Sequence, residues 1–475
     1  VEVEQLVPED DELRAIWEFA GYMELSGFYK DIQSIEGVAG REATDPRLLI
    51  SLWIYSYAKG ISSAREIARL CEYHPAYQWL TGMKPVNYHT LSDFRINHKD
   101  ALDEMFTEAL GLMSAEGLIS LERVMHDGTK VKACAGSDSY RREERVRRHL
   151  EIARRQVAEM GDPETAEEVS PKVAAARQRA AREKQQRLEN ALEELEKIRA
   201  TKSGASAKAE ARVSESDPES RIMKQGNGGY APSYNVQIST DAEAGIIVGV
   251  GVTQAAVDYG ELVPAVERIQ DGCGQKPQQM VTDGGYTSRA NIIELEQQKV
   301  DYIGSMGEGE DQLAAQMNRR GVEPAYYPEA FKYDSTADAY ICPCSKELRY
   351  EGKEERPGRS NYKYRANAND CQHCPAKEKC CPQNAAKGRT IVRGVDDPAV
   401  TAFKEKMQTE EAKQIYKQRG KVAEFTNAWI KDKIGLRQFS VRGLIKAGME
   451  TLWACLTYNI KQWIRLRWRI QWMEN

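Results

Sequence analysis

The order of strands and helices between residues 121 and 306 constrains the fold of this 475-residue chain more than any other feature. Short apolar runs typical of strands alternate there with segments of helical spacing, in the order three strands, helix, strand, helix, strand. The predicted strands are "ERVMHDGTKVKA", "YNVQIST", "GIIVGVGVT", a short run ending at Asp283, and "VDYIGSM". The first three fit an antiparallel meander, and the later ones, separated by helices, fit parallel pairing. The chain is therefore predicted to contain an α/β core with a mixed sheet.

Length and charge narrow the class of protein. A chain of this size holds two to four domains with a buried core. It contains no run of 18 or more apolar residues, and its acidic start, "VEVEQLVPEDDELR", does not resemble a signal peptide, so we expect a cytoplasmic protein without a membrane span. The net charge is −5, but residues 412–475 carry thirteen Lys or Arg against four Asp or Glu. A basic surface for a polyanion is therefore expected in the C-terminal part.

The first 120 residues have helical spacing. Asp45 and Pro46 fit the cap and first position of one helix, and Ser62 or Ser63 caps the next. A further helix is predicted to begin at a Thr90 cap and to expose a polar face, Ser92, Arg95 and Asn97. Short helices joined by a turn over residues 61–98 fit a helix-turn-helix, but a helical bundle that only packs or dimerises fits the same pattern.

A highly charged insert occupies residues 140–220. Its helix formers are broken once, around "GDPETAEEVSP", which predicts a helical hairpin with one arm to about Met160 and a return arm from about Pro171 to Ala200. Residues 201–220 are predicted to be a flexible loop. The basic run "RREERVRRHLEIARRQ" is consistent with DNA contact, and equally with a solvated arm or with pairing to another helix.

A second insert, residues 307–400, carries six of the ten cysteines. In a chain without an export signal, clustered cysteines favour metal binding over disulfides. Cys371 and Cys374 form a C-x2-C pair suited to one tetrahedral zinc, and the predicted set is completed by Cys342 and Cys380, with Cys344 and Cys381 as alternatives. Reduced thiols or a redox pair are the other interpretation. A small module of this kind needs such a staple to fold.

Three carboxylates are candidates for a catalytic centre. Asp283 ends a strand and is followed at once by a glycine turn and a helix, and ligands gather at the carboxyl ends of strands. The alternative interpretation is an ordinary Asp-Gly turn without a function, which has the same residues. Asp127 lies on the first strand, and Glu424 lies on a late helix, two turns before Lys431 on the same face. If these carboxylates converge at one sheet edge, they suit two Mg²⁺ or Mn²⁺ ions, which stabilise the attacking and leaving oxygens in phosphodiester chemistry.

These motifs resemble those of DDE transposases from bacterial insertion sequences. "HDGTKVKA" resembles the strand of the first Asp, "VTDGGY" the second-Asp motif, and "YKQRGKVAEFTNAWIK" the tyrosine–arginine–glutamate–lysine signature. The cysteine-bearing insert resembles the insertion domain of one subgroup. Four residues separate Arg419 from Glu424, where the commonest form of the signature has three.

The resemblance implies a fold and a domain order. The expected fold class is α/β, with a ribonuclease H-like mixed-sheet core formed by residues 121–306 and 401–475. An N-terminal all-α DNA-binding domain, residues 1–120, precedes it, and the helical hairpin of residues 140–220 and the Cys-rich domain of residues 307–400 interrupt it.

The resemblance also implies roles for single residues. Asp127, Asp283 and Glu424 become ligands of two Mg²⁺ or Mn²⁺ ions. It assigns Tyr416, Arg419 and Lys431 to double-stranded DNA. Arg95, at the start of the predicted recognition helix, and Lys130 are further DNA-binding candidates. The implied activity is metal-dependent cleavage of the element's inverted-repeat ends, followed by joining of the 3′-hydroxyls to target DNA by a homodimer acting at the nucleoid. A catalytically silent DNA-binding regulator and a plain metal-dependent nuclease of the same fold are the alternatives.

Overall fold

A computed structural model describes residues 2–30, 43–160, 170–306, 309–383 and 387–474, and the chain divides into two compact units. Unit 1 comprises residues 1–277 and 419–475, and unit 2 comprises residues 278–418. Each unit is described by itself.

An antiparallel sheet built around β5 (Tyr230–Asp241) lies in unit 1. β5 pairs with β1 (Arg123–Lys132), β4 (Arg221–Lys224) and β6 (Ile247–Thr253), all antiparallel. The register places Asp127 opposite Ile238. The predicted antiparallel meander of the first three strands is confirmed. α11 (Leu262–Cys273) follows β6 and buries Leu262, Ala265, Val266 and Ile269.

Helices form the N-terminal part of unit 1. They are α1 (Glu12–Tyr22), α2 (Ser26–Tyr29), α3 (Pro46–Ala58), α4 (Ala64–Tyr73), α5 (Pro75–Thr81), α6 (Tyr88–Asn97) and α7 (Lys99–Ala115), preceded by the short η1 (Val3–Leu6). The Asp45 carboxylate caps α3 by accepting a hydrogen bond from the Arg47 N–H at 2.8 Å, as predicted. Ser63 caps α4. The predicted Thr90 cap is wrong, because Asn87 caps α6 and the helix begins at Tyr88.

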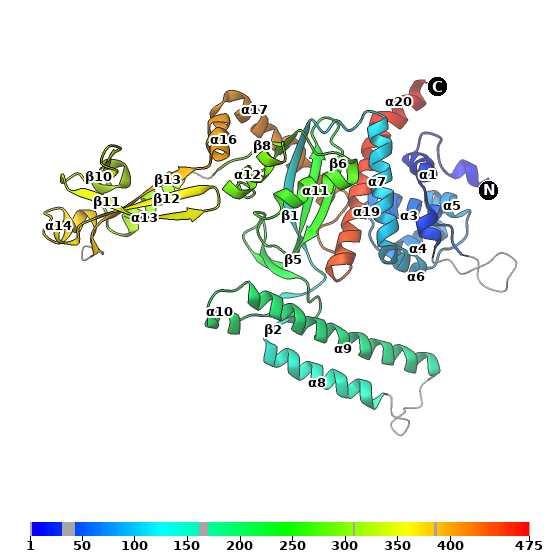
Figure 1. Ribbon diagram of the computed structural model, residues 1–475. Helices are drawn as coiled ribbons and strands as arrows, with labels where there is room; N and C mark the ends of the chain where they lie inside the picture. Colours follow the sequence, from blue (N-terminus) through cyan, green and yellow to red (C-terminus); the bar gives the residue numbers. More distant parts are fainter. Residues whose placement is uncertain (1, 31–42, 161–169, 307–308, 384–386, 475) are drawn as a thin grey trace. The chain divides into compact units, whose positions relative to one another are not determined.

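α19 (Leu444–Trp463) is the central helix of unit 1 (Figure 1). Fourteen of its twenty residues are buried, as expected for a helix covered on all sides. It contacts α3, α6 and α7 as well as β6. The Asn459 amide accepts a hydrogen bond from the Ile247 N–H and donates one to the Ile247 carbonyl, both at 2.8 Å. The N-terminal helices and the sheet therefore share one helix as core. η8 (Ile464–Trp468) and α20 (Arg469–Glu474) follow it.

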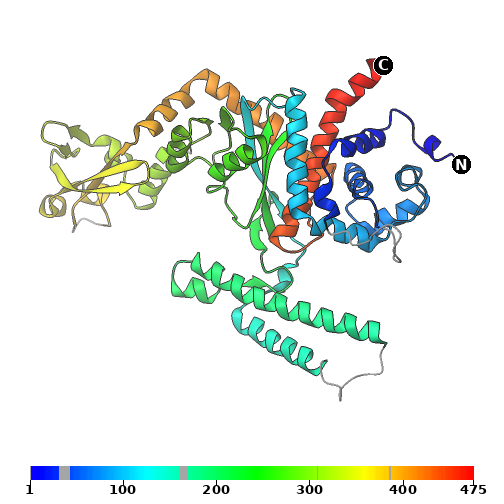
Figure 2. The same ribbon diagram turned by 45° about the vertical axis from the view of Figure 1, so that its right-hand side comes forward.

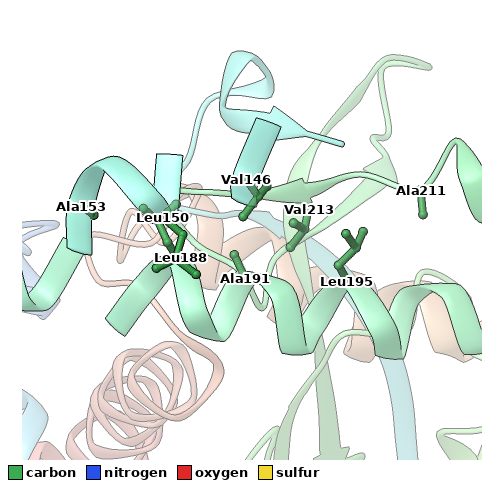
Figure 3. Close-up of a cluster of buried hydrophobic side chains, with 8 residues drawn as sticks. All are labelled: Val146, Leu150, Ala153, Leu188, Ala191, Leu195, Ala211 and Val213. Atoms are coloured by element: carbon green, nitrogen blue, oxygen red, sulfur yellow. The ribbon is translucent and has the colours of Figure 1, made fainter. Parts of the chain in front are cut away.

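The predicted helical hairpin is confirmed as α8 (Glu143–Glu159) and α9 (Pro171–Ala200), which lie side by side (Figure 2). The break predicted between them falls mostly outside the described residues. Apolar side chains spaced by three or four residues face each other across the hairpin (Figure 3). This shared core comprises Val146, Leu150, Ala153, Leu188, Ala191, Leu195, Ala211 and Val213.

Residues 201–220 are not a flexible loop, and that prediction is wrong. They contain α10 (Ala205–Ala209) and β3 (Val213–Ser214), which pairs with β2 (Tyr140–Arg141) just after η2 (Ser137–Ser139). The buried Asp217 accepts a hydrogen bond from the Tyr234 hydroxyl at 2.7 Å. These polar residues are ordered by partners elsewhere in unit 1, which their composition does not reveal.

Unit 2 begins with a parallel pair, β7 (Gln279–Val281) and β8 (Asp301–Ile303), connected by α12 (Arg289–Gln297), as predicted. The cysteine-bearing region that follows forms a five-stranded antiparallel sheet in the order β13-β12-β11-β10-β9. Its strands are β9 (Lys332–Asp334), β10 (Ala339–Ile341), β11 (Glu347–Arg356), β12 (Arg359–Ala366) and β13 (Thr390–Asp396). The further helices of unit 2 are α13 (Gly309–Arg319), α14 (Ala368–Gln372), α15 (Lys377–Cys380), α16 (Pro398–Gln408) and α17 (Glu410–Arg419), with short η4 (Pro324–Tyr326) and η5 (Pro328–Ala330) turns. The last residue of α17, Arg419, is the first residue of the second segment of unit 1.

Candidate catalytic site

Two of the three predicted carboxylates meet in unit 1. Arg419 lies between them: its Nη2 is 2.8 Å from Glu424 Oε1, and its Nη1 is 3.9 Å from Asp127 Oδ2. The Asp127 and Arg419 side chains are each 17% exposed, whereas Glu424 is 57% exposed. β1 positions the aspartate, and the segment around Glu424 positions the glutamate. The arrangement gathers two oxygen donors around one cationic group that is largely buried.

The helix carrying Glu424 is locally a π-helix, η7 (Gly420–Glu424), which continues into α18 (Phe425–Asp432). A π-helix hydrogen-bonds each residue to the one five positions away, so a turn holds one residue more than an α turn, and such bulges are frequent at functional sites. Arg419 and Glu424 are five residues apart and still form an ion pair. The additional residue between them, a departure from the commonest signature, is therefore absorbed by the π turn.

Asn427 also contacts Asp127, and the sequence reasoning missed it. Its Nδ2 donates a hydrogen bond of 3.0 Å to Asp127 Oδ2. The residue is 7% exposed, and its Oδ1 is buried without a hydrogen-bond partner among the described residues. A buried amide oxygen without a partner is costly, by about 1–3 kcal/mol, unless something else binds it. Its position three residues after Glu424 places it near the candidate site, but does not reveal the contact with Asp127.

The charge of the Asp127 carboxylate acts on Lys431. Burial lowers the pKa of Lys431, and Arg437 lowers it further, while the carboxylate of Asp127 acts in the opposite direction. The site in unit 1 thus combines Asp127, Glu424 and Asn427 with two cationic side chains, Arg419 and Lys431. Such a mixture can hold a cation through the carboxylates and an anionic substrate through the cations.

Asp283 lies in unit 2, two residues beyond the end of β7. Its Oδ1 accepts a hydrogen bond of 2.8 Å from the Gly285 N–H, which closes the turn. Behind it, the Tyr302 hydroxyl contacts the hydroxyls of Thr282 and Thr287, each at 2.8 Å. Tyr416, on α17, belongs to unit 2 as well. The convergence of Asp283 with Asp127 and Glu424 stays a prediction.

Two family models match the chain. Residues 1–97 match the Transposase domain (DUF772), and residues 341–464 match the Transposase DDE domain. Both matches are consistent with a DDE transposase of an insertion sequence. The subgroup suggested by the signature and the cysteine insert stays a prediction.

The two matched segments contain only part of the site. Tyr416, Arg419, Glu424 and Lys431 fall inside the Transposase DDE domain match, together with the six cysteines of the insert. Asp127 and Asp283 lie outside both matches. Searches of curated proteins and of solved structures found no match. Within the described part of the chain, none of the helices combines the length and apolar character needed to cross a membrane.

The predicted exposure of Arg95 is wrong, and its assignment to DNA stays a prediction. Arg95 is only 6% exposed and lies in the last turn of α6, not at the start of a recognition helix. Its Nη1 donates a hydrogen bond to the Ser62 carbonyl at 2.9 Å and lies 3.6 Å from the buried carboxylate of Glu450, and its guanidinium stacks over Trp53. A polar residue on a short helix predicts an exposed side chain, but α19 covers Arg95.

Lys130 also has a partner inside the protein. Its Nζ is 3.1 Å from Asp258 Oδ1, which also accepts hydrogen bonds from the amides of Asn235 and Gln237. Since β1 residues alternate between the two faces of the sheet, Lys130 does not share the face of Asp127. Its assignment to DNA stays a prediction, with an internal ion pair in competition.

The six cysteines of the insert line one cavity of about 30 Å³ in unit 2. Cys342 Sγ accepts a hydrogen bond from the Lys346 N–H at 3.2 Å, and Cys371 Sγ accepts one from the Arg389 N–H at 3.3 Å. Burial raises the pKa of Cys380 to about 12, and burial followed by the neighbouring Cys374 raises the pKa of Cys344. All ten cysteines are free thiols.

The described residues include no group of three or more His, Cys, Asp or Glu arranged as a metal site. The donor chemistry of the cysteines fits zinc and that of the carboxylates fits magnesium. Neither set has the spacing of a completed coordination shell, so both metal predictions stay predictions.

Proposed function

We propose that the chain is a DNA transposase that cleaves the inverted-repeat ends of its element and joins the freed 3′ ends to target DNA. The observation that carries the proposal is the Asp127–Arg419–Glu424 arrangement in unit 1, whose glutamate and arginine fall inside the Transposase DDE domain match. A ribonuclease H-like core is the fold that we propose for the sheet and its flanking helices. A protein with this substrate in a bacterium works in the cytoplasm, at the nucleoid.

The reaction consists of two displacements at phosphorus. In the first, the oxygen of a water molecule attacks the phosphodiester at the element's end, a P–O bond breaks, and the released 3′ oxygen takes up a proton. In the second, that 3′-hydroxyl attacks a phosphodiester of target DNA, loses its proton, and displaces a second 3′ oxygen. Each displacement replaces one P–O bond by another, so no nucleotide cofactor is needed.

The chain's residues would hold two divalent ions at this site. Asp127 and Glu424 supply carboxylate oxygens, and Asp283 is proposed to supply a third from unit 2. The buried Oδ1 of Asn427, which lacks a partner among the described side chains, is consistent with a cation bound beside Asp127. When bound, the two ions would stabilise the attacking and leaving oxygens.

The cationic side chains have a different task. Arg419 balances the two carboxylates while no other cation is present, because its guanidinium contacts Glu424 and approaches Asp127. We propose that Arg419 and Lys431 bind phosphates of the transposon end, and that Tyr416 orients the same strand. Asn427 holds the Asp127 carboxylate in place through its amide donor. Two ends must be held together for joining, so the working species is proposed to be a homodimer on DNA.

We also propose that the cysteine cavity holds one structural zinc ion, through Cys342, Cys371, Cys374 and Cys380. The support is the gathering of these thiols around a single small cavity and the two backbone N–H donors aimed at their sulfurs. Burial raises the pKa of Cys380, so this thiol stays protonated until a metal displaces the proton. Elemental analysis of protein purified without chelator should find about one zinc per chain; no zinc would contradict the proposal.

Three variants test the carboxylates, with a duplex carrying the inverted repeat that flanks the gene. Asp127→Asn, Asp283→Asn and Glu424→Gln each remove one negative charge and keep the shape of the side chain. Each should bind the duplex like the unchanged protein and neither cleave nor join it in Mg²⁺. Glu410→Gln is the matched control, because Glu410 is exposed and pairs only with Lys413 among the residues described.

The outcomes separate the candidate activities. Full cleavage by any of the three variants would remove that residue from the site. Cleavage of every duplex regardless of sequence, without joining, would indicate a nuclease instead. Binding of the end duplex by the unchanged protein without cleavage in Mg²⁺ or Mn²⁺ would indicate a silent regulator.

A further inference from the structure

A groove of about 780 Å³ lies at the start of α8 in unit 1. Six arginines line it: Arg141, Arg142, Arg145, Arg147, Arg148 and Arg212. The other lining residues are Tyr140 and two glutamates, Glu144 and Glu151. With six positive and two negative side chains, the lining has a net charge of +4. The protein as a whole has a net charge of −5, so this concentration of arginine is local.

The packing of the hairpin explains why these arginines face outward. Val146, Leu150 and Ala153 occupy one face of α8 and are buried against α9 (Figure 3). Arg145 and Arg148, three residues apart, lie on a face of α8 away from that stripe and are exposed. On β3, Val213 points into the same apolar core, and the preceding Arg212 is exposed. The apolar core of the hairpin thus fixes which side presents the arginines.

The positive charge of the groove is only partly balanced. Arg142 pairs with Glu210, and Arg147 pairs with Glu143 at 2.6 Å, but both arginines are more than half exposed, and such surface pairs contribute little. Arg145, Arg148 and Arg212 have no acidic partner among the residues that the structure describes. Guanidinium groups held close together repel one another, and an anion placed between them relieves that repulsion.

We propose that this groove binds the sugar–phosphate backbone of duplex DNA. The inference rests on the proposed function, which makes DNA the substrate. Arginine forks match phosphate oxygens bidentately, and several of them along one groove suit a polyanion with regularly spaced charges. Apart from Tyr140, the lining side chains are all charged, so the groove lacks the apolar anchors that a protein partner needs. Contacts of this kind supply affinity and orientation without reading sequence.

Two triple variants test the groove. Arg145→Gln/Arg148→Gln/Arg212→Gln removes three charges from the groove. Arg155→Gln/Arg179→Gln/Arg182→Gln removes three exposed arginines elsewhere on the same hairpin and is the matched control. Both are made in the Asp127→Asn background, so that binding is measured without cleavage. Thermal melts followed by circular dichroism check that each variant is folded.

Binding is titrated by fluorescence anisotropy with an end duplex and a random duplex of equal length, at several NaCl concentrations. The groove variant should lose roughly 10- to 100-fold in affinity for both duplexes, and the slope of log K against log salt should fall by about 2.7, three phosphate contacts at 0.9 each. The control should lose much less.

Three results would overturn the proposal. They are an equal loss in the groove variant and the control, a loss restricted to the end duplex, and displacement of DNA by poly-glutamate at equal charge concentration, which would indicate an acidic protein as partner. If only the groove proposal is wrong, the unchanged protein still cleaves the end duplex in Mg²⁺. If the proposed function is wrong, that cleavage is absent, and the binding titration still tests the groove.

Discussion

Arg95 and Arg419 occupy contrasting surroundings within unit 1, although the sequence assigns both to DNA. Arg95 is enclosed by Trp53, Tyr57, the Ser62 carbonyl and Glu450. Arg419 stands between Asp127 and Glu424 at the protein surface, and Glu424 is more than half exposed. The first arginine connects the N-terminal helices to α19, whereas the second faces a place where substrate can arrive.

The difference shows that an arginine on a helix acquires its role from what lies opposite to it. Arg95 meets a carboxylate that is itself buried, so the pair has no charge left for a ligand. Arg419 meets two carboxylates whose oxygens suit metal ions, so under the proposed function a bound metal would free its charge for a phosphate. Four measurements test this contrast between a structural and a functional arginine.

The largest effect is expected for Arg95→Met. Removing one member of a buried ion pair leaves Glu450 charged and unpaired, and such losses cost about 3–5 kcal/mol. The free energy of unfolding, measured in urea, should fall by that amount. Glu450→Gln removes the unpaired charge and keeps one acceptor oxygen for Ser440, so the double variant should be more stable than the sum of the single losses predicts.

The opposite result would restore a DNA-reading role. If Arg95→Met keeps its stability but loses its preference for end duplex over random duplex, Arg95 contacts bases and not Glu450.

The next effect is expected for Asn427→Leu. It removes the amide that donates to Asp127 while keeping the side-chain volume. Partners behind a metal ligand typically account for 10- to 100-fold in metal affinity or activity. The Mg²⁺ concentration for half-maximal cleavage should therefore rise by roughly that factor. Thr426→Val is the control, because buried Thr426 donates to the Val422 carbonyl and not to Asp127. An unchanged Mg²⁺ requirement with lower stability would make Asn427 a purely structural residue.

Arg419→Gln should have two smaller effects of opposite sign. Loss of a phosphate contact should weaken duplex binding about tenfold and lower the salt slope by about one unit. Loss of the cation between the carboxylates should strengthen Mn²⁺ binding, measured by electron paramagnetic resonance. Arg437→Gln, which removes an exposed arginine paired with Asp432, should do neither. Weaker Mn²⁺ binding in Arg419→Gln would show that Arg419 supports the metal site and does not compete with it.

The smallest effect concerns His126, which precedes Asp127 on the opposite face of β1. Its ring contacts Ser239 Oγ and Gln237 Oε1, each at 2.8 Å. Burial lowers the pKa of His126 to about 3, so the folded state binds fewer protons than the unfolded state below pH 6.5. Stability conferred by the neutral ring is therefore present above pH 6.5 and is lost as pH falls toward 3.

Between pH 7 and pH 6 this loss is about 0.7 kcal/mol. His126→Gln should remove that part of the pH dependence in urea melts and leave the Mg²⁺ requirement unchanged. An altered Mg²⁺ requirement would show that His126 affects the candidate catalytic site and not only stability.

Local signals predicted much of this fold. Helix caps and apolar periodicity depend only on residues a few positions apart. The start of α3 at Asp45 and the hairpin marked by Val146, Leu150 and Pro171 could therefore be predicted from the sequence. The burial of Arg95 depends on Glu450, and the contact of Asn427 with Asp127 joins residues 300 positions apart. No local pattern encodes such pairs. The additional residue before Glu424 was visible in the sequence, but only the backbone shows that a π turn absorbs it.

The central position of α19 has a consequence for how the chain is synthesised. α3 ends at residue 58, and the helix that covers it extends to residue 463. At 5–20 residues per second, a ribosome needs about 20–80 s to make the chain between them. During that time the apolar side chains of α3 that pack against α19 lack their final cover. A product that ends before α19 therefore leaves exposed the faces of α3, α6 and α7 that this helix covers.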